Sequence, residues 1–148
     1  MNLTESIAIG LVLGFFFYEW VGFSPGGLVV PGYIALYLDR PFMIVSTLAV
    51  SFLAYGLIHG LSRATILYGR RRFILAVISG FVFQWLFEIA AVKTQLFHIE
   101  ADTIGYISPG LIANEMERQR VLPTLSSLVI LSVMVRLTLI LLGFLKSW

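Results

Sequence analysis

The chain has 148 residues, of which 59% are hydrophobic and only 12% are charged, and its mean hydropathy is +0.94. An ordinary soluble domain has about 25% charged residues, so the composition excludes that class and predicts an integral membrane protein with a single domain, residues 1–148. The absence of cysteine excludes disulfides, thiolate metal sites and thiol nucleophiles. The net charge of +2 is too small to indicate a nucleic-acid partner.

Four apolar runs are long enough for membrane-spanning helices, at about 5–23, 41–61, 73–92 and 121–145. Each reaches the roughly 17 to 25 residues that a helix needs to cross a bilayer. A backbone in lipid must satisfy its own hydrogen bonds, which favours helices over loops. The first run has neither a basic region before it nor a convincing cleavage site, so we expect it to stay as an anchor. The expected fold is therefore all-α, with about four transmembrane helices.

Two further segments share a Pro-Gly break followed by a short amphipathic stretch. The first, GGLVVPGYIALYLDR, begins at Gly26, and the second, IGYISPGLIANEMER, begins at Ile104. The motif positions are Gly27, Pro31, Gly32, Asp39 and Arg40 in the first segment, and Gly105, Pro109, Gly110, Asn114, Glu117 and Arg118 in the second.

The neighbouring runs extend this similarity into an internal two-fold repeat. Upstream of the breaks, GLVLGFFF at 10–17 resembles AVISGFVF at 76–83, with an insertion of about 93–104 in the second copy. The sequence therefore predicts repeat 1 at about 5–61, a basic loop at 62–72, and repeat 2 at about 73–145.

The Pro-Gly breaks allow two structural interpretations. Proline lacks an N–H and disfavours helix in the residue before it, and glycine adopts backbone angles that other residues avoid, so each break ends one element and begins another. In a duplicated membrane protein, paired breaks often mark re-entrant half-helices whose free backbone groups line a polar site. Alternatively, both breaks are ordinary interfacial connections, and the sequence leaves the choice open.

The most basic segment is the loop 62–72, which contains Arg63, Arg70, Arg71 and Arg72. The positive-inside rule places this loop in the cytoplasm. With four crossings, both termini are then expected in the cytoplasm too, and the Pro-Gly segments on the other side.

His59, one helical turn before Arg63, and Tyr68 within the loop extend this basic surface. The candidate contact residues for a partner protein, anionic lipid or acidic polymer are His59, Arg63, Tyr68, Arg70, Arg71 and Arg72. The alternative is that their charge only sets the topology. The segment EMERQR at 115–120 alternates acid and base, and we expect it to form a solvated amphipathic helix.

Three ionisable residues inside or near the predicted spans are candidates for a polar membrane site: Glu19, Glu88 and Arg136. Each costs about 2.5 to 3.5 kcal/mol at a helix centre, so each should face protein, water or a partner. The alternative is an internal ion pair of Arg136 with Glu88 or Glu19 that fixes helix packing.

Small residues recur at four-residue spacing and predict close helix contacts, either within the chain or between copies. The pairs are Gly10 with Gly14, Gly56 with Gly60, and Ala76 with Gly80. The sequence contains no phosphate loop, dinucleotide fingerprint, zinc-protease motif or nucleophile elbow. We therefore expect no catalytic residue and no metal site in this chain.

The segments GGLVVPGYIAL, ILYGRRRF and SPGLIAN, in this order and spacing, resemble the small membrane subunit of poly-γ-glutamate synthase, the PgsC/CapC family of bacterial capsule synthesis. The resemblance covers nearly the whole chain. It implies a bacterial plasma membrane protein in complex with an ATP-dependent amide ligase of the PgsB/CapB type, usually alongside a PgsA/CapA-type subunit. ATP and a divalent cation are expected on that ligase, and no cofactor is expected here.

The first functional expectation is thus a non-catalytic subunit that anchors and organises the ligase and guides the polymer at the membrane. The alternative is transport of the polyanion or a small solute through an oligomeric or repeat-interface pathway. A pore for the polyanion through a single copy of the chain is disfavoured. The carboxylates of the polymer would need several basic or hydrogen-bonding groups along their route, and the predicted spans provide Arg136 and little else. We also expect a homo-oligomer.

Overall fold

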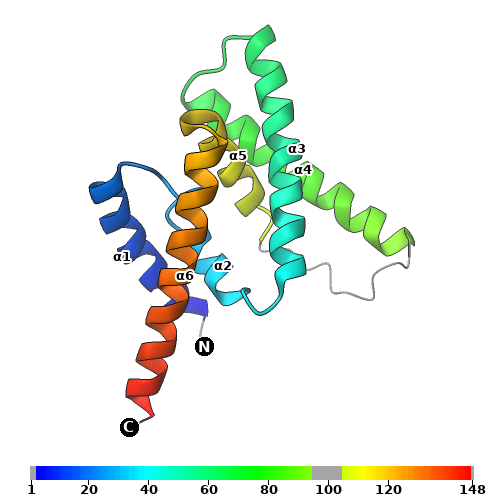
Figure 1. The fold of residues 1–148 in the computed structure, drawn as a ribbon. Coiled ribbons are helices and arrows are strands. Elements are labelled where there is room, and N and C mark those ends of the chain that lie inside the picture. The colour runs from blue at the N-terminus through cyan, green and yellow to red at the C-terminus, as the bar shows by residue number, and fades with distance from the viewer. Residues whose placement is uncertain (1–2, 95–104, 148) are drawn as a thin grey trace.

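The computed structural model describes residues 3–94 and 105–147, which form helices and no strand (Figure 1). In chain order the helices are α1 (Leu3–Val21), α2 (Val30–Leu36), α3 (Pro41–Ala64), α4 (Arg70–Thr94), α5 (Ser108–Gln119) and α6 (Val121–Lys146). Four of them, α1, α3, α4 as far as Ala91, and α6, are long and apolar enough to cross a membrane. This confirms the all-α fold class and the four predicted spans. The insertion expected at 93–104 lies almost entirely outside the described residues.

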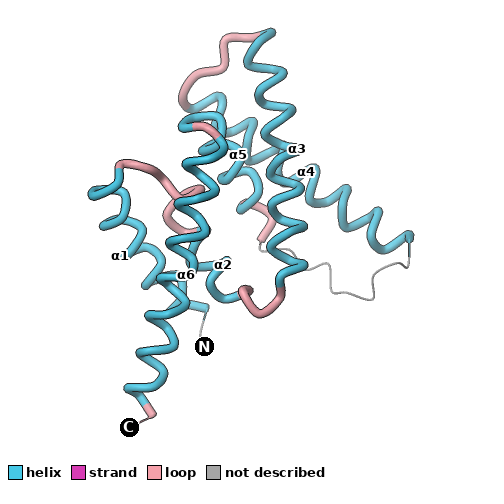
Figure 2. Tube along the Cα trace, viewed as in Figure 1, coloured by secondary structure: helices cyan, strands magenta, loops and turns pink. Residues whose placement is uncertain are grey.

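Each Pro-Gly break begins one of the two short helices, α2 and α5. Pro31 and Pro109 lie in their first turns, where a missing N–H costs no intrahelical hydrogen bond. Before α2, Gly26 and Gly27 have φ angles of 75° and 99°, which residues with a side chain rarely adopt. These glycines let the chain turn back after α1, and Figure 2 shows the loop that does so between α1 and α2.

The short helix of each half runs antiparallel to the long helix before it. A Cβ on Gly14 would contact the Leu28 side chain, whereas a Cβ on Gly32 would lie 2.8 Å from the Ser6 carbonyl oxygen. The chain therefore passes α1 in the reverse direction as it approaches and forms α2. In the second half, Gly110 lies against Gly80, and Asn114 lies one helix turn further along α5, against the start of α4.

The termini and the basic loop lie at opposite ends of the helix array. Figure 1 shows the loop between α3 and α4 at the top of the view, and the start of α1 and the end of α6 near the bottom. The Lys146 Nζ atom lies 3.8 Å from the Glu5 Oε1 atom, so these two ends meet. The expectation that the basic loop and both termini share one side is therefore wrong.

The reason is that the chain also passes along the array in the segments that contain the short helices, in addition to its four long helices. Because α1 and α3 run in the same direction, the segment 22–40 between them must return from one end to the other. The connection between α4 and α6 must do the same. The helices α2 and α5 have only 7 and 12 residues, so a rule for spans of roughly 17 to 25 residues does not detect these returns.

The two halves of the chain make corresponding contacts. Helix α2 packs on α1 of its own half and on α6 of the other half, and α5 packs on α4 and α3 in the same way. The pairs α1 with α6 and α3 with α4 complete the correspondence. In Figure 1, α3 and α6 run in opposite directions, and α1 and α4 diverge to opposite sides.

The small-residue contacts correct the sequence alignment of the two halves. A Cβ on Gly10 would lie 2.8 Å from the Gly32 Cα atom, and a Cβ on Gly80 would lie 2.6 Å from the Gly110 Cα atom. The contacts thus match Gly10 with Gly80, whereas the alignment matched Gly14 with Gly80. That alignment is shifted by one helical turn, and the internal repeat itself stays a prediction.

The central core forms where the two halves meet. Its buried side chains come from both short helices and from α3 and α6, and they are Val30, Ile34, Met43, Ile112, Met116 and Leu128. In contrast, a Cβ on Gly56 or Gly60 would have no neighbouring atom within 4 Å. The prediction that this pair joins helices within the chain is wrong, because it faces outward from α3; a contact between copies stays a prediction.

Candidate functional site: two ion-paired ends and a basic pocket

The acid that follows α2 pairs with a cation on the last helix. Arg136 donates from Nη2 to the Asp39 Oδ2 atom at 2.5 Å and from Nη1 to the Ala35 carbonyl oxygen at 3.4 Å. The arginine side chain is only 17% exposed, whereas that of Asp39 is 72% exposed. Neutralisation by a charge-assisted hydrogen bond lets this arginine lie in an apolar helix.

The acid near the end of α5 is held in the corresponding way. The His59 Nδ1 atom lies 3.1 Å from the Glu117 Oε2 atom, and the Ser62 hydroxyl donates to Glu117 Oε1 at 3.3 Å. Glu117 and Asp39 occupy the aligned positions of the two Pro-Gly segments. Each therefore contacts the last long helix of the opposite half, α3 for Glu117 and α6 for Asp39. These contacts tie the two halves together at both ends of the array.

The three candidates for a polar membrane site lie apart from one another. Arg136 pairs with Asp39, so the alternative of an ion pair with Glu88 or Glu19 is wrong. Glu88 instead accepts a hydrogen bond from the Tyr106 hydroxyl at 2.7 Å. Glu19 is exposed near the end of α1. The structure therefore does not join Glu19, Glu88 and Arg136 into one site.

The segment 115–120 is not the solvated helix that its alternating charges indicated. Glu115 is 8% exposed and Met116 is 1% exposed, because α5 packs against α3, α4 and α6. The Arg118 Nη1 atom lies 3.7 Å from the Glu115 Oε1 atom, and Arg72 donates from Nε to the Asn114 Oδ1 atom at 3.4 Å. Charge alternation did not reveal this burial, because the long helices that cover α5 come from distant parts of the sequence.

Sequence reasoning missed the contribution of Gln119. Its Oε1 atom accepts from the Ser24 backbone N–H at 2.9 Å, and its Nε2 atom donates to the Ser24 carbonyl and, at 3.1 Å, to the Thr124 hydroxyl. One side chain thus joins the start of the first returning segment to the end of the second. Ser24 and Gln119 are 95 positions apart, so no local pattern links them.

The basic end contains a polar pocket of about 310 Å³ between the end of α3 and the start of α4. The residues that line it are Ser62, Arg63, Ala64, Thr65, Ile66, Leu67, Tyr68, Arg72 and Glu117. Of the predicted contact residues, the structure brings Arg63, Tyr68 and Arg72 together here, with His59 behind Glu117. Arg70 and Arg71 do not line the pocket and lie exposed beside it.

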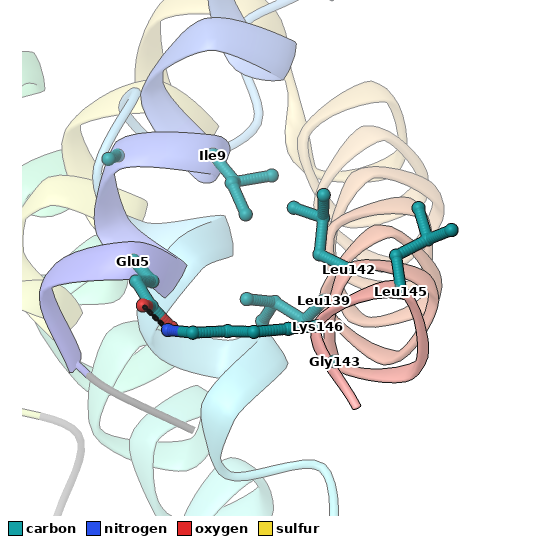
Figure 3. A pocket seen from close by; sticks show the side chains of 8 residues that line it. Glu5, Ile9, Leu139, Leu142, Gly143, Leu145 and Lys146 are labelled. Carbon is teal, nitrogen blue, oxygen red and sulfur yellow. Dashed lines mark ion pairs between the residues drawn. The ribbon is translucent and has the colours of Figure 1, made fainter. Parts of the chain in front are cut away.

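Two larger pockets are mostly apolar. One of about 790 Å³ lies beside the two Pro-Gly segments and is lined by residues that include Tyr33, Phe81 and Tyr106. The other, of about 760 Å³, lies between α1 and α6, and Figure 3 shows Glu5 and Lys146 paired at its edge. No group of three or more His, Asp or Glu side chains within residues 3–94 and 105–147 is placed to hold a metal ion.

These features define an all-helical protein with four helices that are long and apolar enough to cross a membrane, two short helices that begin at Pro-Gly breaks, and one basic end. The chain belongs to the capsule biosynthesis CapC family, whose profile matches residues 9–125. It is 38% identical over 132 residues to the capsule biosynthesis protein CapC of Bacillus anthracis and 39% identical over 132 residues to the PGA biosynthesis protein CapC of Bacillus subtilis (strain 168). Both matches cover 88% of this chain and 89% of the relative. The resemblance is thereby confirmed, and no solved structure matches the chain.

Proposed function

We propose that this chain is an integral membrane subunit of a poly-γ-glutamate capsule synthase in the bacterial plasma membrane. The support comes from two relatives that are named for capsule and PGA biosynthesis and that match almost the whole chain. The outward faces of the long helices add physical support, because they carry large exposed apolar side chains that suit lipid. Phe16, Phe81 and Leu141 are examples, each about half exposed.

The distribution of arginine orients the protein. The end with the α3–α4 loop carries Arg63, Arg70, Arg71, Arg72, Arg118 and Arg120, whereas the opposite end carries Arg40, Lys93, Lys146 and Arg136, of which Arg136 is paired with Asp39. The positive-inside rule therefore places the loop in the cytoplasm. Because the two ends lie on opposite sides of the array, both termini then lie outside the cytoplasm.

The specific role that we propose is to anchor an ATP-dependent ligase of the PgsB/CapB type at the cytoplasmic end. The sequence has no nucleotide-binding motif, so the ligase would hold the ATP and its divalent cation. Arg70 and Arg71 are exposed side by side at the start of α4, where they can contact an acidic surface of the ligase. Arg72 is different, because it donates to Asn114 and helps to hold α5.

Charge reversal at the two exposed arginines tests this role. We expect the Arg70→Glu/Arg71→Glu variant to lose the ligase when the complex is purified in mild detergent. The Lys93→Glu/Lys146→Glu variant is the matched control, since it makes the same charge change on exposed residues at the opposite end. Ligase retained by both variants would contradict docking at Arg70 and Arg71, and ligase lost from both would show that the effect is not specific to this end.

Transport of the polyanion remains the alternative, together with the predicted homo-oligomer and a PgsA/CapA-type partner. The geometry gives it less support, because Arg136 is already paired with Asp39 and is mostly buried. Flux of γ-glutamyl peptides through liposomes that contain only this chain would favour transport. Loss of that flux in Arg136→Leu would assign the pathway to α6.

A further inference from the structure

We propose that the polar pocket at the end of α3 binds the γ-glutamyl chain itself, through a free carboxylate and the neighbouring amide. This inference rests on the proposed function, and it adds a ligand site to a subunit whose proposed role is anchoring. The pocket lies beside Arg70 and Arg71, so a ligase docked there would release its product next to the pocket.

Two guanidinium groups give the pocket its affinity for a carboxylate. Arg63 lines the pocket and makes no hydrogen bond or ion pair within the described part of the chain. Its planar group can donate two parallel hydrogen bonds to one carboxylate. Arg72 lines the same pocket, and its bond from Nε to Asn114 fixes the position of its guanidinium. The exposed Tyr68 hydroxyl adds a third donor.

The remaining wall matches the rest of a γ-glutamyl unit. The Glu117 carboxylate lines the pocket and is held by His59 and Ser62, so it is placed to accept a hydrogen bond from an amide N–H. Ile66 and Leu67 supply an apolar surface for the methylene groups between amide and carboxylate. A phosphate dianion would lie close to the Glu117 charge and would have no amide to offer. The donor set therefore favours an acidic amide polymer over inorganic phosphate.

The pocket between α1 and α6 at the opposite end of the array has a different lining. Asp39, the counterpart of Glu117, is already bonded to Arg136. The pocket in Figure 3 at that end is lined mainly by Ile9, Leu139, Leu142 and Leu145, and its two charges, Glu5 and Lys146, pair with each other. The pocket at the basic end is thus lined by polar and charged side chains, whereas the pocket between α1 and α6 is mostly apolar.

Binding of a defined peptide to the purified chain tests the inference. The probe is a fluorescent decamer of γ-linked glutamate, and its anisotropy is measured with the chain in nanodiscs of phosphatidylcholine, which has no net charge, without ligase. We expect Arg63→Gln to weaken binding at least about tenfold, which is the loss expected for one charge-assisted hydrogen bond. Lys146→Gln, at the opposite end, should bind as the unmodified chain does.

Three outcomes would overturn the inference. The first is unchanged peptide binding by Arg63→Gln. The second is equal loss in Lys146→Gln, which would indicate general charge attraction. The third is displacement of the peptide by inorganic phosphate, or by phosphatidylglycerol in the nanodisc, as effectively as by unlabelled peptide, which would identify a phosphate site.

The ligase measurement separates this inference from the proposed function. Arg63→Gln should still retain the ligase in detergent, since Arg70 and Arg71 are intact. Normal peptide binding by Arg63→Gln, with ligase loss in Arg70→Glu/Arg71→Glu, would refute the pocket and leave the anchoring role. If peptide binding depends on Arg63 but the unmodified chain does not bind ligase, the pocket would be supported and the anchoring role would be refuted.

Discussion

Gly80 contacts Gly110, so we predict that adding a single methyl group at position 80 would push α4 and α5 apart. An alanine at position 80 would place its Cβ 2.6 Å from the Gly110 Cα atom and 3.3 Å from the Pro109 carbonyl carbon. Two carbon atoms prefer a separation of about 3.5 to 4.0 Å, so the helices must move apart by about 1 Å. Both partner atoms belong to the backbone, so no side-chain rotation can relieve the contact.

The size of the effect follows from two opposing terms. Overpacking a tight contact costs about 1 to 3 kcal/mol, and we expect the upper part of that range because the backbone itself must shift. Alanine is a better helix former than glycine by about 1 kcal/mol, which offsets part of this cost. The net loss of unfolding free energy for Gly80→Ala is therefore about 1 to 2 kcal/mol.

Gly60→Ala is the matched control, because a Cβ at Gly60 has no neighbouring atom within 4 Å. We expect this variant to be unchanged or up to about 1 kcal/mol more stable, through helix propensity alone. The assay is unfolding of the purified protein in mixed micelles by increasing dodecyl sulfate, followed by tryptophan fluorescence. If Gly80→Ala is as stable as Gly60→Ala, the packing of α4 on α5 described above is incorrect.

Three further predictions test the ends of the array. Asp39→Ala should destabilise the protein by about 2 to 3 kcal/mol, because it leaves Arg136 mostly buried without its carboxylate. The Asp39→Ala/Arg136→Leu double variant should recover most of that loss in the same unfolding assay, and no recovery would show that the pair is not coupled. Gln119→Ala should cost about 1 to 3 kcal/mol by removing the only described partner of the Ser24 N–H, and faster deuterium exchange in the segment 22–29 would report it. The chain has no cysteine, so single cysteines can be labelled selectively. A membrane-impermeant maleimide should label Ser147→Cys on intact cells, but Thr65→Cys only after permeabilisation. Labelling of both sites from the same side would contradict the proposed orientation.

The sequence predicts the long helices well, because span length and apolar composition are local properties. It also locates both breaks, since proline and glycine interrupt helices and proline is favoured in a first helical turn, where Pro31 and Pro109 lie. The directions of α2 and α5 were not predictable in this way, because 7 and 12 residues are too few to read as crossings. That omission is why the termini were placed on the wrong side relative to the basic loop.

The polar contacts were harder to predict than the helices. Glu117 is 58 positions from His59, and Arg136 is 97 positions from Asp39, so neither pair leaves a periodic signal. Arg136 was correctly expected to need a partner, but the acids considered were those within the long spans. Its actual partner, Asp39, follows α2, which is too short to be predicted as a membrane span. Position along a span therefore predicted the need for a counterion and not its identity.

The packing of α2 on α6 has a consequence for how the protein is made. Ala35 is fully buried against Leu131 and Val135, and Asp39 bonds to Arg136, yet α6 leaves the ribosome after α1 to α5. The first half of the nascent chain therefore enters the membrane without the surface on which its half-helix will rest. Biogenesis must therefore include a docking step after α6 has been made, and a product truncated before α6 would be a substrate for proteases.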